Sequence, residues 1–123
     1  MKIAFIIGSI FGLTGVIAGA LGAHALEKTL TPDQLDSFET AVRFQMYHSL
    51  LLILLGIAQR MVEKSALLDW SVYGVIAGTI LFSGSIYLLV LTPFKMGLVT
   101  PIGGVILIAS WACMMIWAFS LTR

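Results

Sequence analysis

The sequence predicts an all-α membrane protein, a single domain (residues 1–123) in which four transmembrane helices form an antiparallel bundle. Three observations favour this fold class: the composition, the grouping of the charges, and the length of the uncharged stretches. Of the 123 residues, 59% are hydrophobic and 11% are charged, whereas a typical soluble domain has about 25% charged residues. A soluble domain of this length leaves much of its chain at the surface, so its core could not hold so much apolar area.

Four stretches contain no Asp, Glu, Lys or Arg, namely residues 3–26, 44–59, 70–94 and 96–122. A helix needs about 20 mostly apolar residues to cross the hydrocarbon layer, so three stretches are long enough unaided. The second has 16 residues and reaches spanning length through Met61 and Val62, while Arg60 extends its guanidinium to the headgroups. We therefore expect transmembrane helices at about 3–26, 43–62, 69–91 and 100–121.

The first uncharged stretch ends in Ala23, His24 and Ala25, which have the small-x-small form of a signal-peptide cleavage site. Its apolar run is longer than the core of an ordinary signal peptide, and only Lys2 supplies positive charge ahead of it. We therefore expect this stretch to be retained as the first transmembrane helix.

Glycines recur along one face of the first helix at steps of four, three, four and three residues. A repeat that averages 3.5 residues keeps one seam against a neighbouring helix, and small residues let helices approach closely in lipid. Packing is the interpretation that we favour, and a pore or substrate slot lined by small residues is the alternative. The expected packing positions are Gly8, Gly12, Gly15, Gly19 and Gly22, with Gly74 and Gly78 spaced as GxxxG on the third helix.

A polar segment follows the first helix and contains a helix start. Thr31 is the expected N-cap, Pro32 the first helical residue, and Gln34 completes a capping box with Thr31. Apolar residues then recur at helical spacing, with acidic residues on the other side. We expect a short amphipathic helix over about 32–42 that lies on the membrane and runs into the second transmembrane helix, or that folds as a soluble cap over the bundle.

Polar side chains inside the helices are expected to meet near one face of the bilayer. At this face the first helix ends and the antiparallel second helix begins. The third helix ends and the fourth helix begins at the same face. The residues of this expected layer are His24, Gln45, Tyr47, His48, Ser83, Ser85, Tyr87 and Thr100. Polar groups in hydrocarbon need partners, so the layer is either a set of hydrogen bonds that fixes helix register or a pocket for protons or a small ligand.

The sequence predicts no catalytic residues, no metal and no cofactor, and hence no enzyme. Two histidines on adjacent helices are the ligands that a haem or half of a metal site would use, but His24 and His48 stand in no haem or metal motif. Cys113 is the single cysteine and is expected to fill space among apolar side chains. The net charge of +1 provides no basic surface for nucleic acid.

Four ordered motifs resemble a known family. Residues 22–26 read GAHAL, 43–50 read RFQMYHSL, 81–89 read LFSGSIYLL and 100–105 read TPIGGV. They are similar to the small bacterial membrane family catalogued as domain of unknown function 423, whose animal relatives are called transmembrane protein 256. The resemblance implies a four-helix protein of the plasma membrane, and it implies no reaction, substrate or cofactor. It places motif positions at the expected polar layer and also at Pro101 and Gly103.

We expect a non-enzymatic interaction or accessory component that lies in the lipid bilayer and assembles with itself or with another membrane protein. The alternative is a proton or small-solute transporter, or a channel-like protein, that uses a polar layer of His24 and His48. We expect the protein in the cell (plasma or inner) membrane. One side of the predicted bundle carries one more Lys or Arg than the other, which favours termini in the cytoplasm. The two sets compared are Lys2, Arg60, Lys64 and Arg123 on one side, and Lys28, Arg43 and Lys95 on the other.

Overall fold

The computed structural model describes residues 2–121, so Arg123 of the orientation count lies outside the described residues. The helices are α1 (Lys2–Ala23), α2 (Pro32–Met61), α3 (Ala66–Thr79), α4 (Ser85–Leu91) and α5 (Val99–Ser120). A short 3-10 turn (Leu26–Lys28) follows α1, and a π-helical turn (Ile80–Gly84) joins α3 to α4.

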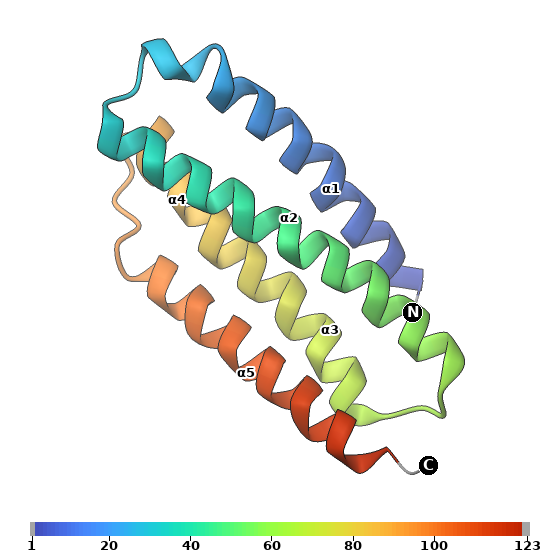
Figure 1. Ribbon diagram of the computed structural model, residues 1–123. Helices are drawn as coiled ribbons and strands as arrows, with labels where there is room; N and C mark the ends of the chain where they lie inside the picture. Colours follow the sequence, from blue (N-terminus) through green and yellow to red (C-terminus); the bar gives the residue numbers. More distant parts are fainter. Residues whose placement is uncertain (1, 122–123) are drawn as a thin grey trace.

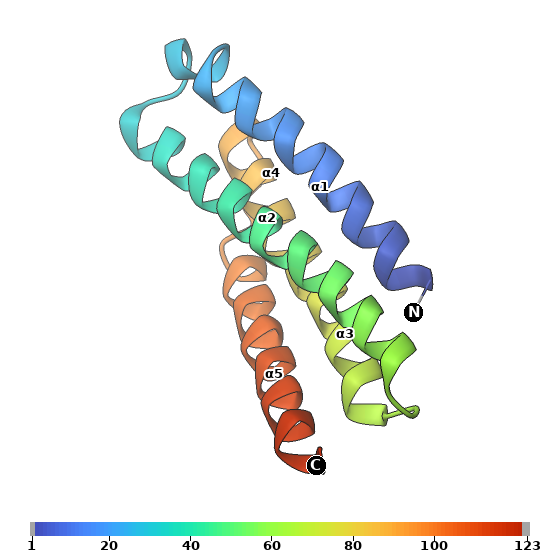
Figure 2. The same ribbon diagram turned by 45° about the vertical axis from the view of Figure 1, so that its right-hand side comes forward.

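The helices run side by side, with α3, the π-helical turn and α4 forming one continuous rod (Figure 1). Four helical segments are long and apolar enough to cross a membrane: α1, α2, the rod over Ala66–Leu91, and α5. Neighbouring segments run in opposite directions, so both ends of the chain lie at one end of the bundle, as a rotated view also shows (Figure 2). This arrangement confirms the predicted all-α bundle of four antiparallel spans.

Helix α2 begins earlier than the charge pattern predicts. The capping box is confirmed, because Gln34 N donates to Thr31 Oγ1 at 3.2 Å and Thr31 N donates to Gln34 Oε1 at 3.0 Å. From Pro32 the helix continues without a break for 30 residues to Met61. The segment expected as an amphipathic helix is therefore helical, and it is the first third of α2 instead of a separate element.

The other boundaries differ by a few residues for a common reason. The absence of charge marks where a helix is lipid-compatible, whereas caps and turns mark where it begins and ends. Thus α1 stops at Ala23, three residues before the end of its uncharged stretch. Ser65 caps α3 by accepting from Leu68 N at 3.4 Å, so α3 begins at Ala66.

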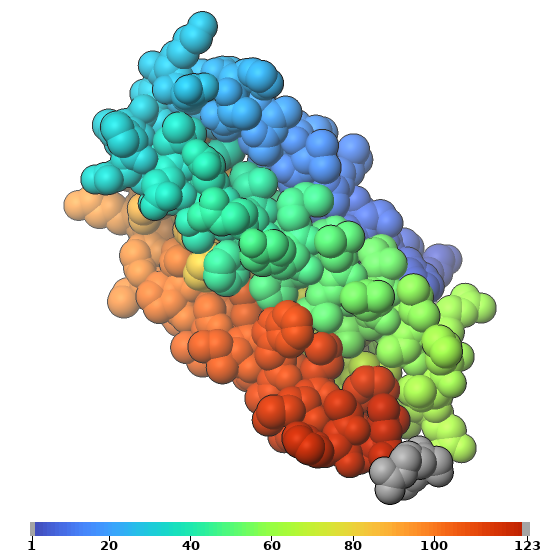
Figure 3. Space-filling model, in the orientation of Figure 1, coloured from blue at the N-terminus to red at the C-terminus, as the bar shows by residue number. Residues whose placement is uncertain are grey.

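The bundle consists of two helical hairpins. Helix α1 packs along α2, α5 packs along α3 and the π-helical turn, and contacts of α2 with α3 and α4 join the two pairs. In space-filling form, the side chains of α1, α2 and α5 form successive bands across one face (Figure 3).

Close approach within each hairpin takes place at glycine. All five glycines of the α1 seam have residues of α2 as their nearest neighbours, from Leu52 beside Gly8 to Phe38 beside Gly22. On α3, Gly74 lies against Ser110 and Gly78 against Leu107 of α5. The structure therefore places the predicted glycine stripes at contacts within one chain.

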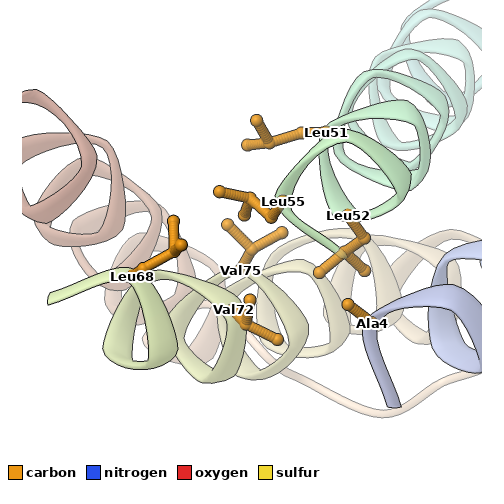
Figure 4. Packing of buried hydrophobic residues seen from close by; sticks show 7 residues of the cluster. All are labelled: Ala4, Leu51, Leu52, Leu55, Leu68, Val72 and Val75. Atoms are coloured by element: carbon orange, nitrogen blue, oxygen red, sulfur yellow. The ribbon is translucent and has the colours of Figure 1, made fainter. Parts of the chain in front are cut away.

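Two apolar clusters occupy opposite ends of the bundle. One is built on Leu52, Leu55, Val72 and their neighbours from α1, α2 and α3 (Figure 4). The other contains Phe38, Ala41, Ile86 and Val90 from α2 and α4. On α2, the buried polar residues lie between the residues of these two clusters.

We predict that Gly103→Ala destabilises the protein and Gly104→Ala does not. A Cβ at Gly103 would lie 2.4 Å from Phe82 N, a backbone atom of the π-helical turn, whereas a Cβ at Gly104 would meet only the Phe82 ring at 3.7 Å. Overpacking against a fixed backbone costs about 1–3 kcal/mol. Thermal unfolding in detergent measures the difference, and equal melting temperatures for the two variants would contradict this close approach.

Candidate functional site

The depth of the polar residues follows from the register of α1 on α2. Contacts pair Gly8 with Leu52, Gly15 with Gln45, and Gly22 with Phe38, so facing residues have numbers that add to 60. His48 is therefore level with the middle of α1. Gln45 and His48 lie near the middle of α2, deeper than the sequence predicts, because α2 begins at Pro32 and not near residue 43. Thr100, in contrast, lies in the first turn of α5, at one end of the bundle.

Gln45 joins three helices. Its amide Nε2 donates to Phe11 O at 2.9 Å and to Thr14 Oγ1 at 2.7 Å on α1. Its Oε1 accepts from the Tyr87 hydroxyl of α4 at 2.6 Å. With 6% of its surface exposed, Gln45 is buried and uses both ends of its amide to hold the two hairpins together.

His48 is buried, and both of its ring nitrogens have partners. Its Nε2 lies 3.2 Å from Trp111 Nε1 of α5, and its Nδ1 lies 2.7 Å from Phe44 O of its own helix. An indole N–H only donates, so Nε2 must accept and Nδ1 must carry the proton. A second proton on the ring would remove the acceptor that Trp111 uses.

Serine hydroxyls complete the connections between helices. Ser83 of the π-helical turn donates to Ala41 O of α2 at 2.7 Å. Ser85 and Thr100 share a hydrogen bond of 2.5 Å between α4 and α5. Six of the eight predicted residues thus make side-chain hydrogen bonds: Gln45, His48, Ser83, Ser85, Tyr87 and Thr100.

The structure does not bring His24 and Tyr47 to this layer. His24 is exposed in the turn after α1, and the register places it level with Asp36. Asp36 precedes His48 on α2 by 12 residues, so His24 and His48 are about 18 Å apart along the bundle. Tyr47 is 59% exposed on the outer face of α2.

Sequence reasoning missed three participants, namely Thr14, Trp111 and Ser49. Ser49 donates to Gly8 O at 2.7 Å and ties α2 to α1. A signal for Thr14 was available, since it stands one residue before Gly15 of the glycine seam and so close to the α2 interface. Nothing in the sequence pairs Trp111 with His48, because α5 packs mainly on α3.

The two histidines cannot bind one metal ion or haem iron in this arrangement, since ligands of one ion lie about 2 Å from it. Within residues 2–121, the structure contains no group of three or more His, Cys, Asp or Glu side chains placed to hold a metal.

A family model described as "Protein of unknown function (DUF423)" matches residues 18–104. The chain belongs to this family. The matched region includes every polar-layer residue that the sequence predicts, from His24 to Thr100, and it ends within the first turns of α5.

DUF423 relatives match almost the whole chain. A protein named UPF0382 membrane protein from Staphylococcus aureus (strain bovine RF122 / ET3-1) is 39% identical over 120 residues, which is 97% of each chain. The UPF0382 inner membrane protein YgdD of Escherichia coli (strain K12) is 37% identical over 124 residues, covering 99% of this chain and 93% of YgdD. No solved structure is significantly similar to the chain. The chain is thus an integral membrane protein of a family with uncharacterised function.

We predict that Gln45 and Tyr87 are energetically coupled. Gln45→Leu and Tyr87→Phe should each lower the stability of the bundle, and the double variant should lose less than the two single effects combined. Hydrogen bonds between membrane helices contribute about 0.5–2 kcal/mol, and the coupling should fall in that range.

Unfolding in detergent measures this cycle. Tyr47→Phe is the matched control, because it removes an exposed tyrosine hydroxyl from α2 and should leave stability unchanged. Purely additive effects of the Gln45 and Tyr87 variants would show that their hydrogen bond holds no helices together.

Proposed function

We propose that this protein is a non-enzymatic, multi-pass component of the cell inner (plasma) membrane that associates with another membrane protein. The relative from Escherichia coli is named an inner membrane protein, which supports the location. The observation that carries the interaction role is an exposed stripe of large side chains on α5.

The polar layer supports a structural role for most of its members. Gln45, Ser49 and Ser83 use their hydrogen bonds to hold other helices of the same chain. Side chains occupied in this way strengthen the bundle.

The stripe on α5 consists of Ile108, Trp111, Met115 and Phe119, which are 70%, 46%, 56% and 84% exposed. Residues three and four apart share a helix face, so these side chains form one surface. Aromatic residues and methionine are enriched at protein interfaces. The exposed face of α1 differs, since its large residues are aliphatic, as is common for a surface against lipid.

A different protein suits this stripe better than a second copy of this chain. Bulky side chains pack closely against a helix that presents small residues. The glycine stripes of this chain already pack against its own helices. The proposed partner is therefore a membrane protein with a small-residue stripe on one transmembrane helix.

The transport alternative has weaker geometric support. It needs His24 and His48 in one layer, and the register separates them by about 18 Å. In addition, His48 already has partners for both ring nitrogens.

We predict that a photo-crosslinking residue at position 108 captures one partner in native membranes, with a small-residue stripe in its captured segment. Met115→Ala and Phe119→Ala should reduce this crosslink severalfold without lowering thermal stability, because both side chains are more than half exposed. A crosslinker at position 13 on α1, where Leu13 is 65% exposed, is the matched control for contact with lipid.

Capture of a second copy, or crosslinks unaffected by the two alanine variants, would contradict the proposal. Proton flux into liposomes separates it from transport. Liposomes that contain the purified protein should show no more proton flux than empty liposomes. A proton flux that His48→Ala abolishes would favour the transporter instead.

The charge bias supports cytoplasmic termini, with the loop after α2 in the cytoplasm and the loop before α5 outside. We predict that a cysteine replacing Lys95 reacts with an impermeant thiol reagent added to intact cells, and that a cysteine replacing Lys64 does not. Labelling of both positions from outside would contradict the antiparallel bundle. Labelling of position 64 alone would show that the bundle has the opposite orientation in the membrane.

A further inference from the structure

A polar cavity of about 350 Å³ lies at the turn between α2 and α3, at the same end of the bundle as the start of α1 (Figure 1). Its volume is within the range typical of small-molecule sites. In contrast to the apolar clusters, its wall contains one basic and one acidic side chain. The residues that line it are Gln59, Lys64, Ser65, Leu68, Asp69 and Tyr73.

The cavity lies at the level of the membrane surface. Asp69 is in the first turn of α3, and Lys64 is exposed in the loop before this helix. Trp70 and Tyr73, which follow Asp69 on α3, are 66% and 54% exposed. Tryptophan and tyrosine are enriched where a helix passes the lipid headgroups. The cavity is therefore placed to meet a headgroup.

One oxygen of the Asp69 carboxylate is held by the chain, and the other is free. Gln59 Nε2 donates to Asp69 Oδ1 at 2.8 Å and ties the end of α2 to the start of α3. Among residues 2–121, no hydrogen bond reaches Asp69 Oδ2, and the enclosed side-chain atoms without a partner are Gln59 Oε1 and Thr79 Oγ1. Oδ2 is therefore accessible, and a carboxylate oxygen only accepts.

Hydrogen-bond donors lie beside this acceptor in the same wall. The Lys64 ammonium has three N–H groups and accepts nothing. Ser65 Oγ caps α3 by accepting from Leu68 N at 3.4 Å, so its own proton remains available. The wall thus offers donors to an anionic group and a carboxylate to a cationic group.

The two opposite charges favour a ligand that carries both signs. A simple anion would meet Asp69 and a simple cation would meet Lys64, and like charges disfavour both. A phosphate with a primary ammonium matches the wall, because the phosphate accepts from Lys64 and Ser65 while the ammonium donates to Asp69 Oδ2. A trimethylated ammonium has no N–H and cannot donate.

The outer face of α3 leads from the cavity into the bilayer. Tyr73, Ala77 and Ile80 are exposed and recur at helical spacing, so they form one uncharged strip. Ile80 follows Asp69 by 11 residues, which is about 16 Å along a helix. A lipid with its head in the cavity would therefore extend its acyl chains along this strip toward the bilayer centre.

We propose that the cavity at the α2–α3 turn binds the headgroup of phosphatidylethanolamine from the leaflet at this end of the bundle. The phosphate lies against Lys64 and Ser65, and the ammonium lies against Asp69. No residue of α5 lines the cavity, so this site goes beyond the proposed partner surface and is tested separately from it.

Native mass spectrometry of the purified full chain tests the headgroup with three phospholipids that share dioleoyl chains: phosphatidylethanolamine, phosphatidylcholine and phosphatidylglycerol. We predict a one-to-one complex with phosphatidylethanolamine and about tenfold weaker binding of the other two, the effect of one hydrogen bond to a charged group. Equal binding of phosphatidylcholine would show that no N–H is recognised, and equal binding of phosphatidylglycerol would show that no ammonium is needed. Either result overturns the proposal.

Soluble O-phosphoethanolamine, which has the same head without acyl chains, tests the source of the ligand. At a concentration equal to that of the lipid, it should not displace phosphatidylethanolamine, because it cannot use the apolar strip on α3. Displacement at that concentration would overturn the assignment of a lipid and indicate a soluble phosphate ester with an amine.

Asp69→Asn separates the charge from the fold. The asparagine amide oxygen can still accept from Gln59, so the melting temperature of lipid-free protein should change little. The preference for phosphatidylethanolamine over phosphatidylglycerol should disappear. Glu63→Gln is the matched control, because it removes an exposed acidic charge beside the cavity from a residue that does not line it. An unchanged preference in Asp69→Asn would overturn the proposal.

Lys64→Gln should weaken the binding of all three phospholipids severalfold, because all three carry the phosphate. Arg60→Gln is the matched control, since Arg60 is exposed at the same end of the bundle and does not line the cavity. Lys64 is exposed in a loop, so this variant tests the site even if Asp69→Asn fails to fold. Unchanged binding in Lys64→Gln would also overturn the proposal.

Discussion

Helix α2 touches every other span, and hydrocarbon offers no water to the polar groups that it carries. Each of those groups therefore needs a partner inside the protein. Gln45 finds partners on α1 and α4, His48 on α5, and Ser49 on α1. The rest of the bundle depends on this requirement, since the same bonds that satisfy the polar groups of α2 also position the helices around it.

Two kinds of contact hold the bundle together. Within each hairpin, glycine lets backbones approach so closely that dispersion and serine-to-carbonyl bonds hold the pair. Ser49 donates to Gly8 O between α2 and α1, and Ser71 donates to Ser110 O between α3 and α5, where Gly74 lies against Ser110. Between the hairpins, longer side chains reach across, and Gln45 with Tyr87 is the clearest case. Close packing is stiff, whereas a bridge of side chains tolerates space beside it. Two cavities with Thr14, Gln45 and Tyr87 in their walls lie beside this bridge, between α1 and the α3–α4 rod, which belong to different hairpins.

Much of the fold could be predicted from the sequence, because the cost of charge in lipid is a property of single residues and their spacing. The four spans, the capping box at Thr31 and the helix period of the glycines are all local features. The depth of a residue in the bundle and its hydrogen-bond partners are not local features. His24 follows α1 and was expected beside His48, yet the register of α1 on α2 separates them, and that register depends on packing along the whole interface. Thr79 Oγ1 is buried without a hydrogen-bond partner, which is likewise visible only when every neighbour is in place.

The π-helical turn at Ile80–Gly84 has a geometric consequence for the rod that contains it. Such a turn holds one more residue than an α-helical turn would, and each residue advances an α-helix by about 100° around its axis. Residues before and after it therefore follow two different angular phases, which lets α3 present Gly74 and Gly78 to α5 while α4 presents Tyr87 to α2. If the same residues were wound as a regular α-helix, Tyr87 would lie about a quarter of a turn away from Gln45, so the wider turn is what keeps this link between the two hairpins in place.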